Sequence, residues 1–154
     1  MKKILLTFIA LIVGISAFAA DKDDALGFFN SFVQASNNYS TSLLDMYSGN
    51  AKIIRQVVKP DGKLVNVNFD IEDYKAQMKI SAKLAKLKKY KNNYSNTNVT
   101  KVSNGYKIEA LRQPTGESYK LKTAFVVQKQ PNGKWLIVEE MMQTKVQSLL
   151  KYAK

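Results

Sequence analysis

The side chains that could do chemistry in this sequence are carboxylates, tyrosines, arginines and lysines, because the chain has no histidine and no cysteine. It therefore has no thiolate nucleophile, no serine–histidine or cysteine–histidine pair, and no zinc site of the usual ligands. Histidine is also the commonest general acid or base at neutral pH. The composition argues against catalysis, and it predicts no metal and no cofactor.

The acidic and basic side chains on predicted strands are few. Glu139 and Glu140 are adjacent, so their side chains point to opposite faces of a strand and only one can point inward. They therefore cannot form a catalytic pair of carboxylates. Arg55 and Arg112 are the only arginines. Each is either an ordinary charge on the sheet surface or a bidentate partner for a carboxylate or a ligand acid group.

Residues 74–91, YKAQMKISAKLAKLKKYK, contain seven lysines and no acid. Four apolar residues share one side of the predicted helix: Ala76, Ile80, Leu84 and Leu87. Four lysines follow one flank of that stripe: Lys75, Lys79, Lys83 and Lys86. One hypothesis packs the stripe on the sheet and leaves the lysines in water. The other makes the lysines a patch that binds an acidic protein partner or an anionic envelope surface. Few aromatic residues are interleaved, which argues against nucleic acid.

Residues 1–19 have the three parts of a secretory signal peptide. Lys2 and Lys3 form the positive start, residues 4–15 form the apolar run, and Ala17-Phe18-Ala19 supplies the small residues of a cleavage site. The run is shorter than the roughly 20 residues that span a bilayer. We therefore expect a periplasmic or secreted protein, cleaved near Ala19, with a single domain over residues 20–154.

Local patterns predict the elements that position these side chains. Helical spacing predicts a helix from Asp23 or Asp24 to Asn38 and a shorter one over 40–50, capped by Ser40 or Thr41. Two alternating runs flank Pro60-Asp61-Gly62 and predict a hairpin over 51–69. Asp70 then caps the lysine-rich helix.

The last third predicts a meander. Four β-rich runs between residues 94 and 142 are separated by turns that contain glycine, and a short helix over 146–152 ends the chain. The fold class is therefore α+β: a strongly curved antiparallel sheet packed by about three N-terminal and middle helices, plus a short C-terminal helix.

The order of the predicted elements and two short sequence segments resemble the nuclear transport factor 2-like superfamily, whose fold is a cone of curved sheet closed by helices. SLLDMYSGNAKI is similar to its passage from helix to first strand, and NGKWLIVEEMMQ is similar to its closing strand. The resemblance covers roughly residues 24–145 and implies a pocket between the helices and the concave face. Enzymes of this superfamily, such as ketosteroid isomerase, use Asp, His and Tyr inside the cone, and this chain has no histidine.

The resemblance implies a set of inward-facing residues. The acid candidates are Asp45, Glu109 and Glu139. The expected ligand pocket consists of Tyr47, Arg55, Tyr106, Phe125, Trp135, Glu139 and Met141.

Three functions remain open. The first is an exported, non-enzymatic binding domain whose apolar cone holds a small apolar or amphipathic molecule, such as a lipid. The second is an envelope accessory protein that binds a partner or forms a homodimer, using the basic helix 74–91. The third is an isomerase- or dehydratase-like enzyme, which requires Asp45, Tyr47 and Glu139 to converge.

Overall fold

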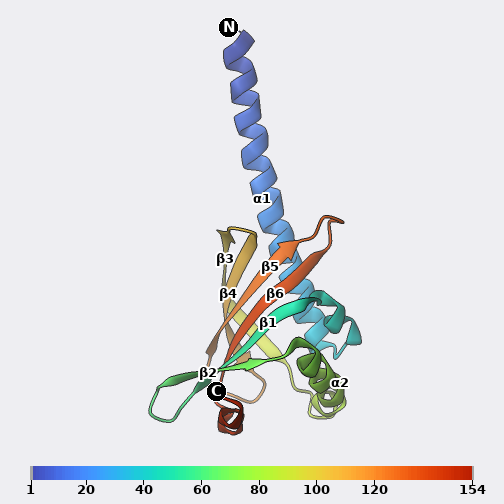
Figure 1. Cartoon of the computed structure of the whole chain (residues 1–154), viewed down its shortest axis with the longest axis vertical. Coiled ribbons are helices and arrows are strands. Elements are labelled where there is room, and N and C mark those ends of the chain that lie inside the picture. The colour runs from blue at the N-terminus through green and yellow to red at the C-terminus, as the bar shows by residue number, and fades with distance from the viewer. Residues whose placement is uncertain (1, 154) are drawn as a thin grey trace.

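A computed structural model describes the backbone of residues 2–153 and the side chains of residues 19–153. The helical elements are α1 (Lys2–Asn37), the 3₁₀ segment η1 (Thr41–Met46), α2 (Ile71–Leu87) and the 3₁₀ segment η2 (Gln147–Tyr152). The strands are β1 (Tyr47–Val58), β2 (Leu64–Phe69), β3 (Asn92–Val102), β4 (Gly105–Pro114), β5 (Leu121–Lys129) and β6 (Trp135–Thr144). Figure 1 shows their arrangement.

The six strands form one curved, open sheet in the order β2-β1-β6-β5-β4-β3 (Figure 1). The predicted α+β class, the hairpin of β1 with β2 and the meander from β3 to β6 are confirmed. The prediction that the sheet is wholly antiparallel is wrong, because β1 pairs with β6 in parallel. A parallel pair requires a long connection along the chain. Here the connection from β1 to β6 contains β2, α2 and β3 to β5.

The predicted start of α2 is also confirmed. Asp70 has an extended backbone and its side chain accepts hydrogen bonds from the N–H groups of Glu72, at 2.8 Å, and Asp73, at 3.2 Å. These bonds satisfy donors that have no partner within the helix. Glu72 and Asp73 also place negative charge at the positive end of the helix dipole.

The N-terminal elements differ from the prediction. The helix expected from Asp23 or Asp24 begins at Lys2 and continues to Asn37. The predicted second helix is a 3₁₀ segment of six residues that Ser40 caps as expected, and it ends early because β1 already begins at Tyr47. The predicted leader, 1–19, lies almost wholly outside the residues whose side chains are described. No helix among the described residues is long and apolar enough to cross a membrane.

The concave side of the sheet is filled by side chains. Phe29 and Phe32 of α1 are buried and place their ring centroids 5.2 and 5.0 Å from that of Phe125 on β5. Tyr47 and Tyr94 pack against the same rings. Aromatic pairs at these separations add about 0.5–1.5 kcal/mol each beyond the area that they bury. The cone therefore contains an aromatic core in the place where the resemblance implied a pocket.

The apolar stripe of α2 faces solvent, which corrects the prediction that it packs on the sheet. The exposed fractions are 71% for Ile80, 53% for Leu84 and 81% for Leu87. The helix packs through its opposite side, where Ile71 is buried and Met78 is half-buried against the core. Both sides carry apolar residues at helical spacing, and periodicity alone does not distinguish them.

Candidate functional site

A buried ion pair lies at the centre of the cone. The Glu140 side chain on β6 is fully buried, and its Oε1 lies 2.6 Å from Nη2 of Arg55 on β1. Two tyrosine hydroxyls donate to the same carboxylate: Tyr47 to Oε2 and Tyr74 of α2 to Oε1, the latter at 3.1 Å. Arg55 also donates to the Tyr74 hydroxyl at 2.6 Å. Each carboxylate oxygen thus has a hydrogen-bond donor, as a buried charge requires.

The environment of this network keeps its tyrosines protonated. Burial, and then the negative charge of Glu140, raises the pKa of Tyr47 well above its ordinary value of 10.0. Burial raises the pKa of Tyr74 to about 12, although the Arg55 guanidinium acts in the opposite direction. Both hydroxyls therefore remain donors at neutral pH. A carboxylate that an arginine and two phenols already occupy is poorly placed to remove a proton from a substrate.

The inward carboxylate is Glu140, which corrects the expectation for Glu139. Along β6, Ile137 pairs with Val127 of β5 but Glu139 pairs with Val126, so Val138 is an extra residue in β6. This bulge reverses the alternation. Before it Ile137 points inward, and after it Glu140 and Met142 do, so that Glu139 and Met141 lie on the outer face. The Glu139 side chain is 41% exposed, 3.9 Å from the Lys52 amine.

The other expected pocket residues do not form one site. Tyr47 and Arg55 meet at Glu140, whereas Phe125 belongs to the aromatic core. Tyr106 and Trp135 pack on each other, with their ring centroids 6.1 Å apart. The Lys129 amine lies over the Trp135 ring.

The enzyme hypothesis requires Asp45, Tyr47 and Glu139 to converge, and they do not. Asp45 and Glu109 are exposed, and Glu139 lies on the outer face, so none of them converges with the buried Tyr47. Among the described residues no group of three acids is arranged to hold a metal ion.

Arg112 occupies a second buried position, near the end of β4. Its guanidinium donates to Oδ1 of Asn92 and to the carbonyl of Gln143, both at 2.8 Å. Its side chain has no carboxylate within ion-pair distance among the described residues, and its Nε has no partner there. Of the two alternatives for each arginine, a sheet-surface charge or an acid partner, Arg55 has the acid partner, whereas Arg112 is buried without one among the described residues.

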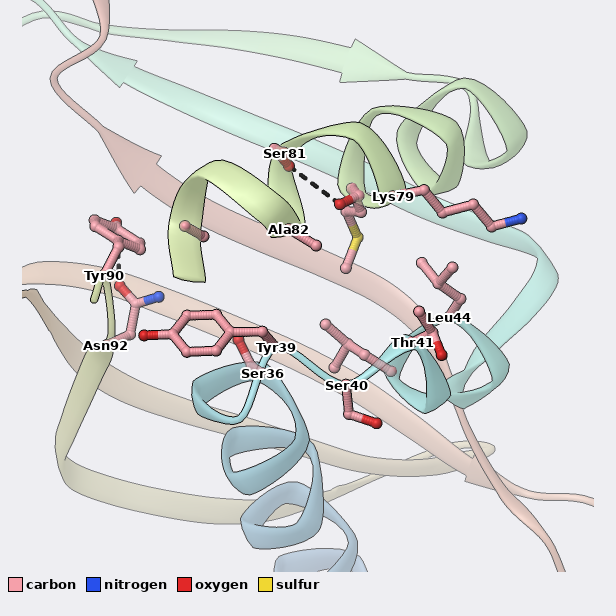
Figure 2. A pocket seen from close by; sticks show the side chains of 13 residues that line it. Ser36, Tyr39, Ser40, Thr41, Leu44, Lys79, Ser81, Ala82, Tyr90 and Asn92 are labelled. Atoms are coloured by element: carbon pink, nitrogen blue, oxygen red, sulfur yellow. Dashed lines mark hydrogen bonds between the residues drawn. The ribbon is translucent and has the colours of Figure 1, made fainter. Parts of the chain in front are cut away.

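A small cavity lies outside the filled cone, between the end of α1, η1 and α2 (Figure 2). Its volume is about 170 Å³. The walls are largely apolar: Leu43 and Leu44 come from η1, and Met78, Ala82 and Ala85 come from α2. None of the expected pocket residues lines it. The half-buried side of α2 forms one wall of the cavity. The apolar periodicity of the sequence had indicated the other side of this helix.

Tyr39 is the polar residue that shapes this cavity. The N–H of Ser40 bonds the carbonyl of Ala35 at 3.0 Å, and the N–H of Tyr39 bonds that of Ser36 at 3.1 Å. This is a Schellman ending of α1, with Tyr39 at the left-handed position that glycine usually occupies. Its φ is 58°, a conformation that costs a bulky residue about 1–2 kcal/mol.

The Tyr39 hydroxyl has no hydrogen-bond partner among the described residues, although it is buried. Figure 2 shows the ring lying along the cavity with its hydroxyl on the side of Asn92, while the Lys79 amine points away. Burying a hydroxyl without a partner costs about 1–3 kcal/mol. Strained backbone and unpaired polar groups cluster at functional sites. This cavity is therefore the candidate binding site.

Comparison with known proteins assigns the architecture. The sequence matches no described protein family and no curated protein. The structure is similar to a nuclear transport factor 2-like protein with a cystatin-like fold from Novosphingobium aromaticivorans. The TM-score is 0.66 at 8% identity, over 90% of this chain and 94% of that one. The chain has the nuclear transport factor 2-like fold.

Other solved structures that are similar to this one carry different descriptions. A candidate ketosteroid isomerase from Shewanella frigidimarina gives a TM-score of 0.56 at 17% identity, over 77% of this chain and 93% of that one. A yeast complex of the deubiquitinase Ubp3 with its cofactor Bre5 gives 0.57 at 16% identity, over 78% and 92%. At such identities the similarity establishes the fold, and function must be argued from the site.

Replacing Glu140 tests the buried ion pair. Glu140→Gln leaves the Arg55 guanidinium, whose side chain is 14% exposed, without its counter-charge. We expect the free energy of unfolding, measured by urea denaturation, to fall by about 3–5 kcal/mol. Glu139→Gln is the matched control on the outer face and should change it by less than about 0.5 kcal/mol. Equal effects of the two substitutions would show that the ion pair does not support the fold.

The tyrosine pKa values predict an alkaline loss of stability. In the unfolded chain the phenols ionise near their ordinary pKa, whereas folded Tyr74 retains its proton up to about pH 12. The unfolded state therefore binds fewer protons between about pH 10 and pH 12, and the free energy of unfolding falls as pH rises through that window. In urea titrations across this range, Tyr74→Phe should show a smaller decline. A decline as steep as that of the unsubstituted protein would contradict the assignment.

Proposed function

We propose that this protein is an exported, non-enzymatic binding domain that holds a small, mainly apolar molecule in the cavity of Figure 2. The observation that carries the proposal is the Tyr39 hydroxyl, which is buried and has no hydrogen-bond partner among the described residues. A ligand with one hydrogen-bonding group would satisfy this hydroxyl. The leucine, methionine and alanine side chains would surround the rest of the ligand.

The size of the cavity limits the ligand. A dry apolar cavity of about 150 Å³ holds a benzene molecule in an engineered protein. The cavity here, at about 170 Å³, suits a molecule of one ring with a single hydroxyl or carbonyl group. A long-chain lipid would not be enclosed, so the proposal narrows the amphipathic ligand expected from the sequence to a compact one.

Export with cleavage near Ala19 is part of this proposal, because the acidic residues that follow this site suit the start of a helix. Cleavage would place Asp21 and Asp24 in the first turn of the shortened helix, where the helix dipole favours acids. Both carboxylates already contact the Lys129 amine, Asp21 at 3.0 Å and Asp24 at 3.7 Å. The shortened helix would thus keep its contacts with β5.

The Tyr39 hydroxyl gives a test in which stability and binding change in opposite directions. Tyr39→Phe removes a buried hydroxyl that has no partner, so we expect the unliganded protein to gain about 1 kcal/mol. The same substitution should weaken binding of phenol or benzyl alcohol roughly tenfold, since the ligand loses its hydrogen bond. Calorimetry with these two compounds, and with benzene as an apolar reference, measures the effect. Unchanged affinities would contradict the role of Tyr39.

Filling the cavity provides the matched controls. Ala82→Leu adds bulk to the cavity wall and should abolish binding of phenol, benzyl alcohol and benzene. Ala76→Leu makes the same change on the exposed side of α2, outside this cavity, and should leave the affinities unchanged. If Ala82→Leu still binds the three compounds, the cavity is not their site.

The native host supplies the test of ligand and export together. We expect native mass spectrometry of protein purified from its host to show a bound species that organic solvent removes. The denatured mass should correspond to residues 20–154. A full-length mass would contradict export, whereas protein that is empty as isolated and also indifferent to added compounds would contradict ligand binding.

A further inference from the structure

The outer side of α2 combines exposed apolar and basic residues. We define the outer ridge as Ile80, Leu84 and Leu87, which are four and three residues apart and so lie on one side of the helix. All three are more than half exposed. Figure 1 shows α2 at the side of the molecule, and the α2 residues that belong to the core or pack against it are Ile71, Tyr74 and Met78. Large apolar side chains grouped on an exposed surface mark an interaction site more often than scattered ones do.

The charge beside the outer ridge is one-sided. We define the basic flank as Lys79, Lys83 and Lys86, all exposed, and Lys88, Lys89 and Lys91 extend the positive charge beyond the helix. Of the seven lysines in residues 74–91, Lys75 alone has a carboxylate within 4.0 Å among the described side chains: that of Glu72, at 3.6 Å. The acids of α2 are confined to its first turn. The C-terminal two turns are therefore both basic and apolar.

We propose that α2 binds an anionic lipid bilayer, with the outer ridge inserted at the level of the headgroups and upper acyl chains. Helices that lie in the membrane interface have this composition, with large apolar residues on one side and lysines beside them. The lysine stems reach along the apolar boundary while their amines contact lipid phosphates. Because the acids lie in the first turn, the C-terminal end of α2 would be the deeper one.

A bilayer fits this surface better than a folded acidic protein does. The outer ridge consists of three exposed aliphatic side chains, for which a protein partner would need a complementary groove, whereas lipids rearrange around any shape. Flexible, unpaired lysines also suit a mobile layer of phosphates. The inference does not depend on the proposed ligand, because the cavity of Figure 2 lies on the side of α2 away from the outer ridge, and Lys79 alone of the basic flank also lines it.

The basic flank is tested by vesicle binding of the full chain. We expect binding to vesicles of equal parts phosphatidylglycerol and phosphatidylcholine, falling as salt rises, and much weaker binding to pure phosphatidylcholine. Lys79→Gln, Lys83→Gln and Lys86→Gln together should weaken binding to the anionic vesicles about 100-fold. The control combines Lys63→Gln, Lys122→Gln and Lys134→Gln, three exposed positions away from α2. The N-terminal segment is the same in all variants, so it cannot cause a difference between them.

The outer ridge is tested separately. Ile80→Ser, Leu84→Ser and Leu87→Ser together should weaken binding at least about tenfold and remove the part that persists at high salt. Leu64→Ser, at an exposed leucine on β2, is the matched control. Because the substituted side chains are exposed, the thermal unfolding midpoint should stay within a few degrees of the original in every variant, and this is checked first.

Insertion itself is tested with a single label. The chain has no cysteine, so Leu87→Cys creates a unique site for a dye whose emission rises in an apolar environment. Emission should rise on anionic vesicles, and Leu64→Cys with the same dye should show little change.

Three results would overturn the proposal. The first is unchanged vesicle binding in the basic-flank variant, and the second is an equal loss in its lysine control. The third is a loss confined to the lysine variant with no effect of the outer ridge and no rise in emission, which would indicate a purely electrostatic surface for a soluble acidic partner.

Discussion

The buried carboxylate of Glu140 constrains the rest of this structure. A fully buried charge is tolerated only when a counter-charge and hydrogen-bond donors surround it, and Arg55, Tyr47 and Tyr74 supply them. Together with Glu140 these residues come from three elements, β1, α2 and β6, so the parallel pairing of β1 with β6 and the docking of α2 satisfy the same requirement. If any one of the three were displaced, a charge or a hydroxyl would be left unpaired in the core. The ion pair thus specifies where the sheet and the helix meet.

Filling the cone has a consequence for binding. The resemblance implied a pocket between the helices and the concave face, but here the ion-pair network and the phenylalanine cluster occupy that space. One apolar cavity outside the filled cone lies between α2 and the end of α1. Its shape depends on a helix ending that places Tyr39, rather than glycine, in the left-handed conformation. Tyr39 has a strained backbone and a buried hydroxyl without a partner among the described residues, and neither feature stabilises the protein without a ligand. That combination is why we place recognition at this position.

Local features of the sequence could be predicted, and non-local ones could not. The Asp70 cap, the turn at Gly62 and the strands of the meander depend on neighbouring residues, and their sequence patterns were sufficient. The extra residue Val138 carries no glycine or proline to mark it, yet it moves Glu140 inward and Glu139 outward. The inward acid that the resemblance implied, Glu139, is therefore on the outer face. The parallel pairing joins β1 and β6, the first and the last strand along the sequence, and no local signal specifies it.

The two sides of α2 show why periodicity needs packing to be interpreted. Met78, Ala82 and Ala85 face the cavity, whereas Ile80, Leu84 and Leu87 repeat with the same period on the outside. The larger aliphatic residues form the exposed set, so a rule that assigns the more apolar side to the core selects the wrong face. A helix that only covered a core would gain solubility from polar residues at those three positions. Their exposure, beside lysines that lack acidic partners, implies that the outer side of α2 meets a second apolar and anionic environment, and a membrane surface is both.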